Sequence, residues 1–131
     1  MKIDQILETC LYVHDLAESR RFYEGLLGLS FYSEAEGRHV FFRLHNGMFL
    51  LFNASATMAP DSDFPAHGTA GHGHAAFRVA PEEIPRWRQH LCDSGIPLEK
   101  EWTWPNGAPS IYFRDPSGNV LEITTGALWG Y

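Results

Sequence analysis

The feature that most constrains the fold of this sequence is an internal repeat, in which each copy covers about half of the chain. The apolar residues Leu11 and Val13 recur as Phe77 and Val79 at an offset of 66, and residues 41–43 recur as residues 112–114 at an offset of 71. The second copy therefore carries five additional residues, most simply placed in the loop 102–109. Repeats of this kind predict two copies of one supersecondary unit that bury a common core.

Hydrophobic periodicity predicts the order β-α-β-β-β in both halves. In the first half we expect a helix between Asp15 and Gly28, with strands at Ile6–Val13, Leu29–Ser33, His39–Leu44 and Met48–Phe52. In the second half we expect a helix from Pro81 to near Gly95, with strands at His74–Val79, Leu98–Trp102, Ser110–Arg114 and Val120–Thr124. The predicted class is α+β, as one domain made of a first module 1–54, a linker 55–71, a second module 72–125 and a tail 126–131.

Charge and cysteine usage exclude several classes of partner. The 131 residues include 10 Lys and Arg against 16 Asp and Glu, a formal net charge of −6. We therefore expect no nucleic acid and no anionic membrane as partner. No stretch approaches the roughly 18–20 apolar residues of a membrane helix, and the first residues lack a signal-peptide pattern. The two cysteines, Cys10 and Cys92, are far apart, which predicts a reducing, cytoplasmic location.

The repeat also aligns side chains that bind metals. The offset of 66 places Glu8 opposite His74, and the offset of 71 places Leu51 opposite Glu122. Strand alternation puts Glu8, His74 and Glu122 on the face opposite the apolar residues. Imidazole and carboxylates suit one divalent ion per site, whether Zn, Ni, Mn, Co or Fe(II). Three protein ligands leave positions open for water or substrate, which is typical of a catalytic site, and Glu8 or Glu122 is a candidate catalytic base.

Three segments resemble the vicinal oxygen chelate superfamily, which includes glyoxalase I, fosfomycin-resistance proteins, extradiol dioxygenases and bleomycin-resistance proteins. These segments are Leu11-Tyr12-Val13-His14-Asp15-Leu16, Gly73-His74-Ala75-Ala76-Phe77 and the run from Phe113 to Glu122. The resemblance covers nearly the whole chain and is specific for the fold. The same motifs say little about which reaction the protein catalyses.

The resemblance implies paired βαβββ modules whose curved mixed sheets surround a metal cleft. It also implies a homodimer, often with the cleft shared between modules of different subunits. His74 and Glu122 fall where the family places a second-half histidine and a last-strand glutamate, and Glu8 falls where many members have histidine and others glutamine or glutamate. Leu51 falls where glyoxalase I has a glutamate that is both ligand and base, a departure that argues against authentic glyoxalase I chemistry.

Further side chains are expected to line the substrate pocket. Cys10 and Tyr12 share the face of Glu8, Arg78 shares the face of His74, and Trp102 begins the extended loop. An arginine in such a place suits a substrate carboxylate or phosphate, although pairing with an acidic residue is the commoner fate. The predicted pocket residues are Cys10, Tyr12, Leu51, Arg78, Trp102, Tyr112 and Arg114. The competing interpretation is that Glu8 pairs with an arginine and His74 is an ordinary pocket histidine.

The leading hypothesis for function is a metal-dependent lyase or isomerase of glyoxalase type that acts on a small oxygen-chelating substrate. One alternative is an Fe(II) extradiol-type dioxygenase. Another is a metal-free small-molecule binding protein of the bleomycin-resistance type, which the aromatic content of 14% permits. Fosfomycin-type thiol transfer is disfavoured, because it requires a cationic phosphonate site and the acidic chain shows no cluster of basic residues.

Overall fold

A computed structural model of the chain describes residues 1–60 and 63–131 and divides them into two compact units, Met1–His72 and Gly73–Tyr131. The strands are β1 Glu8–Tyr12, β2 Ser30–Ala35, β3 His39–Leu44, β4 Gly47–Phe52, β5 His74–Val79, β6 Lys100–Thr103, β7 Pro109–Arg114 and β8 Val120–Thr125. The α-helices are α1 Leu16–Arg20, α2 Ala54–Thr57 and α3 Ile84–Asp93. A π-helical segment, Arg21–Leu26, continues α1, and short 3-10 turns span Pro81–Glu83 and Gly126–Trp129.

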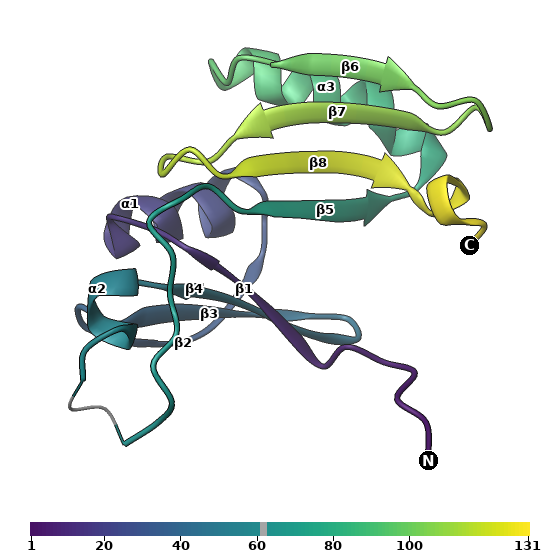
Figure 1. The fold of residues 1–131 in the computed structure, drawn as a ribbon. Helices are drawn as coiled ribbons and strands as arrows, with labels where there is room; N and C mark the ends of the chain where they lie inside the picture. Colours follow the sequence, from purple (N-terminus) through teal and green to yellow (C-terminus); the bar gives the residue numbers. More distant parts are fainter. Residues whose placement is uncertain (61–62) are drawn as a thin grey trace. The chain divides into compact units, whose positions relative to one another are not determined.

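The two units have the same sheet topology (Figure 1). The first sheet has the order β1-β4-β3-β2 and the second β5-β8-β7-β6, with a parallel pair at one edge of each and antiparallel pairs elsewhere. This arrangement confirms the α+β class and the tandem βαβββ modules predicted from the repeat. The only α-helix in the described residues that was not predicted is α2, which begins where the Asn53 side chain accepts a hydrogen bond from Ser55 N at 3.0 Å.

In the first unit, the helical segment after β1 covers one face of the sheet. Asp15 begins α1 by accepting a hydrogen bond from Glu18 N at 2.8 Å, which satisfies one of the free N–H groups of the first turn. The fully buried ring of Tyr23 then lies 5.3 Å from that of Phe49 on β4 and 6.0 Å from that of Phe42 on β3. These contacts make one sheet face the core, so the opposite face is free to carry functional side chains.

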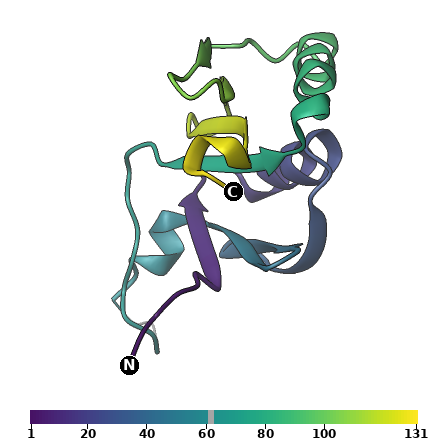
Figure 2. The ribbon, with the colours of Figure 1, turned by 90° about the vertical axis from the view of Figure 1, so that its right-hand side faces the viewer.

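In the second unit, α3 covers one face of the sheet (Figures 1 and 2). Leu91 and Ile84 of the helix are buried, and the sheet contributes the buried side chains Ile111, Phe113, Leu121 and Ile123. Each such side chain stabilises the fold by roughly 1.5–3 kcal/mol on transfer from water. Strand alternation therefore points the other set of side chains of β5, β7 and β8 away from this core.

The turn between β7 and β8 fixes the start of β5. The buried Asp115 carboxylate accepts hydrogen bonds from the backbone N–H of Ser117 at 2.9 Å and of Asn119 at 2.8 Å. The Asn119 side chain in turn accepts from Gly73 N at 2.7 Å. Because His74 follows Gly73 directly, this turn helps to set the position of the first residue of β5.

Candidate metal centre

Two of the predicted metal ligands lie together in the second unit. β5 and β8 pair in parallel with His74 opposite Val120, so Glu122 is the next residue of β8 on the same face. His74 Nε2 lies 3.4 Å from Glu122 Oε2. The histidine side chain is 51% exposed and the carboxylate only 5%, so the imidazole is open to solvent while the carboxylate is held in the protein.

The hydrogen bonding of His74 suits a metal ligand. Its Nδ1 lies 3.0 Å from the carbonyl oxygen of Val120. A carbonyl can only accept, so Nδ1 carries the hydrogen, and in the neutral imidazole the lone pair is on Nε2. That lone pair faces a carboxylate oxygen, an arrangement that a cation between them would stabilise. Two ligand bonds of about 2.1 Å meeting at about 109° span about 3.4 Å, which is the observed separation.

The other carboxylate oxygen of Glu122, Oε1, accepts a hydrogen bond from a side chain of the same sheet. Ser110 Oγ donates a hydrogen bond to Glu122 Oε1, and Trp104 Nε1 donates to Ser110 Oγ at 2.9 Å. Tyr112, opposite Glu122 in the ladder, has its ring centroid 6.4 Å from that of His74. Burial raises the pKa of Tyr112, and the charge of Glu122 raises it further. The partners Ser110 and Trp104 were not predicted, although alternation on β7 places Ser110 on the face of Tyr112.

The third predicted ligand, Glu8, belongs to the first unit. It is the first residue of β1, its side chain is exposed, and it shares a face with Cys10 and Tyr12. Within residues 1–60 and 63–131, no group of three or more His, Cys, Asp or Glu side chains is suited to a metal ion. The structure thus brings His74 and Glu122 together and leaves Glu8 as a predicted ligand on another sheet.

The strand register corrects one predicted equivalence. Leu11 pairs with Leu51 in the first unit and its repeat partner Phe77 pairs with Ile123 in the second, so Leu51 corresponds to Ile123. The position equivalent to Glu122 is therefore Leu50. Leu51 is fully buried on the face of Phe49, toward the helical segment, and we no longer place it in the substrate pocket.

An aromatic cluster lies on the face of the first sheet that carries Glu8. Its rings belong to Tyr12, His39, Phe41, Phe52 and His67. His39 and Phe41 stack at 3.9 Å between centroids, and the Tyr12 hydroxyl lies 2.6 Å from His67 Nδ1. Burial, followed by the hydrogen bond with Cys10, raises the pKa of Tyr12 to about 12. The Tyr12 hydroxyl is therefore protonated at neutral pH. Of these five residues, only Tyr12 was among the predicted pocket residues.

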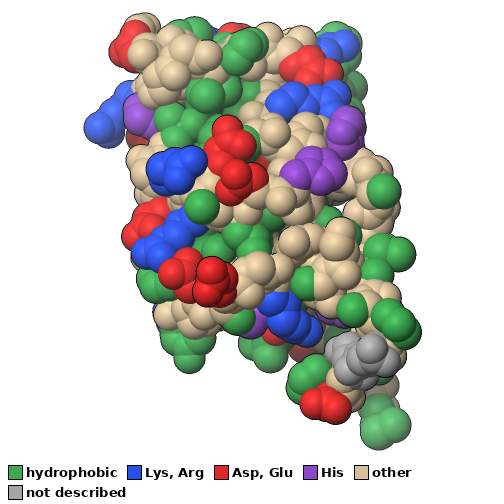
Figure 3. Space-filling view, turned by 90° about the vertical axis from the view of Figure 1, so that its left-hand side faces the viewer, with side chains coloured by type: hydrophobic (Ala, Val, Ile, Leu, Met, Phe, Trp, Pro, Cys, Tyr) green, Lys and Arg blue, Asp and Glu red, His purple; other side chains and the backbone are tan. Residues whose placement is uncertain are grey.

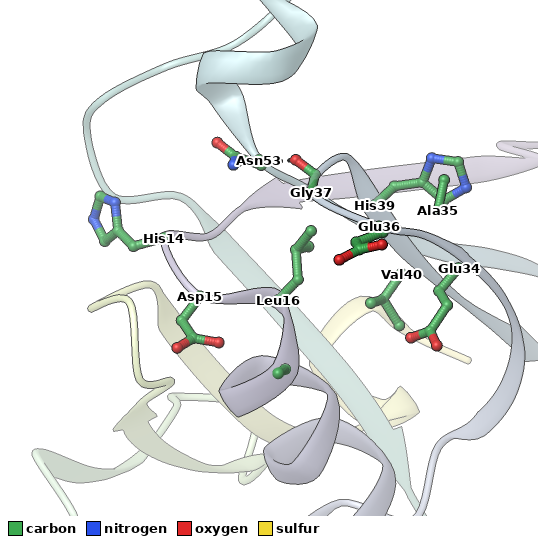
Figure 4. A pocket seen from close by; sticks show the side chains of 11 residues that line it. His14, Asp15, Leu16, Glu34, Ala35, Glu36, Gly37, His39, Val40 and Asn53 are labelled. Carbon is green, nitrogen blue, oxygen red and sulfur yellow. Dashed lines mark hydrogen bonds between the residues drawn. The ribbon is translucent and has the colours of Figure 1, made fainter.

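A groove of about 560 Å³ opens at one end of the first unit (Figure 4). It is lined by residues 14–17, 34–37, 39–40 and Asn53. Two of its three carboxylates have structural partners: Asp15 caps α1, and Glu34 pairs with Arg20 at 3.0 Å. Burial and the charge of Arg38 lower the pKa of His39, so its imidazole is neutral at pH 7.

The remaining predicted pocket residues lie on the second sheet. Arg78 packs against Gly126, where an added Cβ would lie 2.9 Å from the guanidinium carbon. Trp102 is 48% exposed, with the Lys100 ammonium 4.8 Å from its ring centroid. Arg114 donates to Glu99 Oε1 and to the Gly118 carbonyl, both at 2.8 Å. The guanidinium of Arg114 thus binds protein groups. This is the commoner of the two alternatives given for such an arginine, pairing with an acidic residue rather than binding a substrate anion.

The Arg114–Glu99 pair gives a pH-dependent contribution to stability. The hydrogen bond from Arg114 lowers the pKa of Glu99 below its value in the unfolded chain, about 4.3. The contribution of this pair to stability is therefore complete above the unfolded-state pKa of Glu99. It is lost as the pH falls through the lower pKa of Glu99 in the folded protein. We expect Glu99→Gln to lower the denaturation midpoint slightly at pH 7, and we expect its difference from the unsubstituted protein to shrink as the pH falls below about 4.3. Denaturant titrations with Glu82→Gln as control measure this, and a difference that persists unchanged at low pH contradicts it.

The distribution of charge on the face that Figure 3 draws agrees with the acidic composition of the chain. Acidic and basic side chains are interspersed there with hydrophobic ones, and this face presents no continuous basic stripe of the kind that nucleic acid binds. Among the described residues, no helix has both the length and the apolar composition needed to cross a bilayer.

Comparisons with known proteins agree on one family. The family model described as the Glyoxalase/Bleomycin resistance protein/Dioxygenase superfamily matches residues 2–123. Metallothiol transferase FosB of Bacillus licheniformis is 31% identical over 118 residues, which cover 89% of this chain and 72% of that protein. FosB of Staphylococcus saprophyticus is 29% identical, covering 96% and 80%. The crystal structure of lactoylglutathione lyase from Agrobacterium tumefaciens superposes with a TM-score of 0.96 at 36% identity, with all of both chains covered.

Proposed function

The chain belongs to the glyoxalase/bleomycin resistance protein/dioxygenase superfamily, and from that premise we propose that it is a divalent-metal-dependent lyase or isomerase of glyoxalase type. Its substrate is a small molecule that binds the ion through one or two oxygens. The observation that carries this proposal is the His74–Glu122 pair, in which Nε2 of the imidazole and a carboxylate oxygen lie 3.4 Å apart. The similarity to lactoylglutathione lyase over the whole chain supports the reaction class.

The proposed ligands are Glu8, His74 and Glu122. When bound, the ion supplies Lewis-acid polarisation of a substrate oxygen. Of the two carboxylates, Glu122 is buried and hydrogen-bonded by Ser110, whereas Glu8 is exposed and its side chain makes no hydrogen bond or ion pair within the described residues. Glu8 therefore has the greater freedom to accept a proton from substrate, and we assign it the role of base.

Because two ligands lie on one unit and the third on the other, the proposed site requires the two units to meet around one ion. The second unit comes either from the same chain or from a second copy. We propose a homodimer with a shared cleft, in which Tyr112 and Trp102 of one sheet and Cys10 and Tyr12 of the other contact the substrate. Arg114 is then peripheral, because its guanidinium is bonded to Glu99 and Gly118 of its own unit. Arg78 is exposed on the face of His74 and remains a proposed pocket residue.

A second candidate is thiol transfer. Its support is that the similar curated proteins are named metallothiol transferases, at 31% and 29% identity. The sequence argument against it was the absence of a basic cluster. The structure adds that the Arg114 guanidinium is bonded to Glu99 and Gly118. Both candidates share the same metal ligands, so one protein preparation tests them together.

The experiment loads chelator-free protein with Zn, Ni, Mn, Co or, without oxygen, Fe(II). The loaded protein then receives either methylglyoxal with a low-molecular-weight thiol or fosfomycin with the same thiol. We expect ion-dependent thioester formation with the first pair, with Glu8 as the base in place of the glutamate that is missing at Leu50, the equivalent of Glu122 in the first unit. Adduct formation with fosfomycin alone favours thiol transfer instead. Protein that takes up none of the five ions contradicts the enzyme and favours the metal-free binding protein.

A further inference from the structure

A chain of hydrogen bonds leads to the Oε1 oxygen of Glu122, and the donors and acceptors in it fix its direction. Trp104 Nε1–H can only donate, and it does so to Ser110 Oγ at 2.9 Å. Ser110 has one hydroxyl hydrogen and donates it to Glu122 Oε1. A second hydroxyl nearby, on Thr124, lies 3.3 Å from Ser110 Oγ and donates to the Pro109 carbonyl at 2.8 Å. The chain therefore runs from the indole through the serine to the carboxylate.

This chain leaves the two oxygens of Glu122 in different environments. Oε1 accepts from a serine that is 1% exposed, and Oε2 faces His74 Nε2. The last torsion of a glutamate side chain is broad and two-fold, so the carboxylate of an unrestrained glutamate samples many orientations. The hydrogen bond also offsets part of the cost of burying a carboxylate that is only 5% exposed.

One of the connections that are longer in the second unit supplies the indole. Trp104 begins the loop between β6 and β7, which is closed by hydrogen bonds from Gly107 N to Trp104 O at 2.8 Å and from Trp104 N to Ala108 O at 2.9 Å. The corresponding connection of the first unit, between β2 and β3, is only residues 36–38. The equivalent of Glu122 there is Leu50, so the longer loop occurs in the unit that has a carboxylate to orient.

We propose that Ser110, held by Trp104, is the positioning residue that orients the Glu122 carboxylate so that Oε2 is presented to the metal ion. This role rests on the proposed function, because it concerns one ligand of the same site. Ser110 and Trp104 contact neither the ion nor the substrate. Their contribution is to select one orientation of a ligand before the ion binds.

The test measures the dissociation constant for Zn by calorimetry, together with the indole N–H resonance of Trp104 in metal-free protein. Loss of a group that orients a ligand typically weakens metal binding by about 10–100-fold, and we expect this of Ser110→Ala. Ser110→Thr keeps the donor and is expected to recover most of the affinity, and Trp104→Phe is expected to fall between the two. The indole resonance should move upfield in Ser110→Ala.

Thr124→Val is the matched control, because it removes a buried hydroxyl beside Ser110 but no bond to Glu122. It is expected to leave both the zinc affinity and the Trp104 resonance close to those of the unsubstituted protein. If Ser110→Ala binds zinc as tightly as the unsubstituted protein, or if Thr124→Val loses as much zinc affinity as Ser110→Ala, the proposed role of Ser110 is wrong. The proposed function is not affected by either result. If the unsubstituted protein binds no ion, the proposed function fails and this role fails with it.

Discussion

Replacing Glu122 with alanine is expected to weaken divalent-metal binding by at least about 100-fold, more than the 10–100-fold typical of groups that only support a ligand. The substitution removes the one carboxylate that lies within 3.4 Å of His74 Nε2 in the described residues, and Leu50 at the equivalent position of the first sheet has no ligand atom to replace it. The measurement is metal content after dialysis, combined with calorimetric titration. The far-ultraviolet circular dichroism spectrum checks that the sheet is intact.

Glu101→Ala is the control, since Glu101 lies in the same unit but pairs with Arg88 at 2.6 Å and has no place in the proposed site. It should bind the ion like the unsubstituted protein. Retention of metal by a folded Glu122→Ala variant would contradict the assignment of this ligand.

Mixing the inactive Glu8→Ala and Glu122→Ala variants extends this test to the shared cleft. If the ligands come from two copies, subunit exchange creates mixed dimers in which one of the two sites has all three ligands, and metal binding partly returns. If all three ligands come from one chain, every site lacks a ligand and none returns. Partial recovery therefore supports the homodimer with a shared cleft, and its absence after demonstrated exchange contradicts that arrangement.

Replacing Phe113 with alanine is expected to lower the free energy of unfolding by about 3–5 kcal/mol. The Phe113 side chain is fully buried on the core face of β7, opposite Leu121 in the ladder and on the same face as Ile111. Its removal loses the transfer free energy of the ring and leaves a cavity that rigid strands close only in part. All four tryptophans, at positions 87, 102, 104 and 129, lie in the second unit, so tryptophan fluorescence during denaturant titration reports on the unit that carries the change.

Trp129→Ala provides the comparison for the loss of an aromatic ring, because Trp129 is 78% exposed. This substitution should change the free energy of unfolding by no more than about 0.5 kcal/mol. A loss in Phe113→Ala as small as that of the control would contradict the assignment of this sheet face to the core.

Much of the fold follows from the sequence because the repeat and the strand alternation are local signals. The strands 39–44 and 74–79 have the predicted bounds, and α1 begins at the predicted cap, Asp15. Alternation also places His74 and Glu122 on one face, as the ladder confirms. The pairing of these two side chains was therefore predictable, although its geometry was not.

The one-residue error at Leu51 has a physical cause in the hairpin turns. Matching Gly47 with Gly118 assumed that the two glycines occupy equivalent positions in their hairpin turns. Gly47 is required because an added Cβ would lie 2.5 Å from the Leu7 carbonyl oxygen, whereas Gly118 adopts a positive φ of 86°. The turn of the second unit, residues 115–119, is also longer than the two-residue turn of the first. The match of glycines therefore displaced the two last strands by one residue.

The other partners could not be predicted because they depend on where loops pack. His67 meets Tyr12 across 55 residues of sequence, and Trp104 reaches Ser110 only because its loop folds back on β7. No periodic signal extends through either segment. Loop placement is set by such tertiary contacts, so its side-chain partners become visible only in the structure.

X-ray absorption spectroscopy of the zinc-loaded protein is the most direct test of the central claim that two carboxylates and one imidazole bind one ion. The account predicts a first shell of oxygen and nitrogen at about 2.0–2.2 Å, with the outer-shell scattering of a single imidazole and no sulfur. A sulfur neighbour at about 2.3 Å, which would place Cys10 or Cys92 on the ion, or scattering from more than one imidazole, would contradict it.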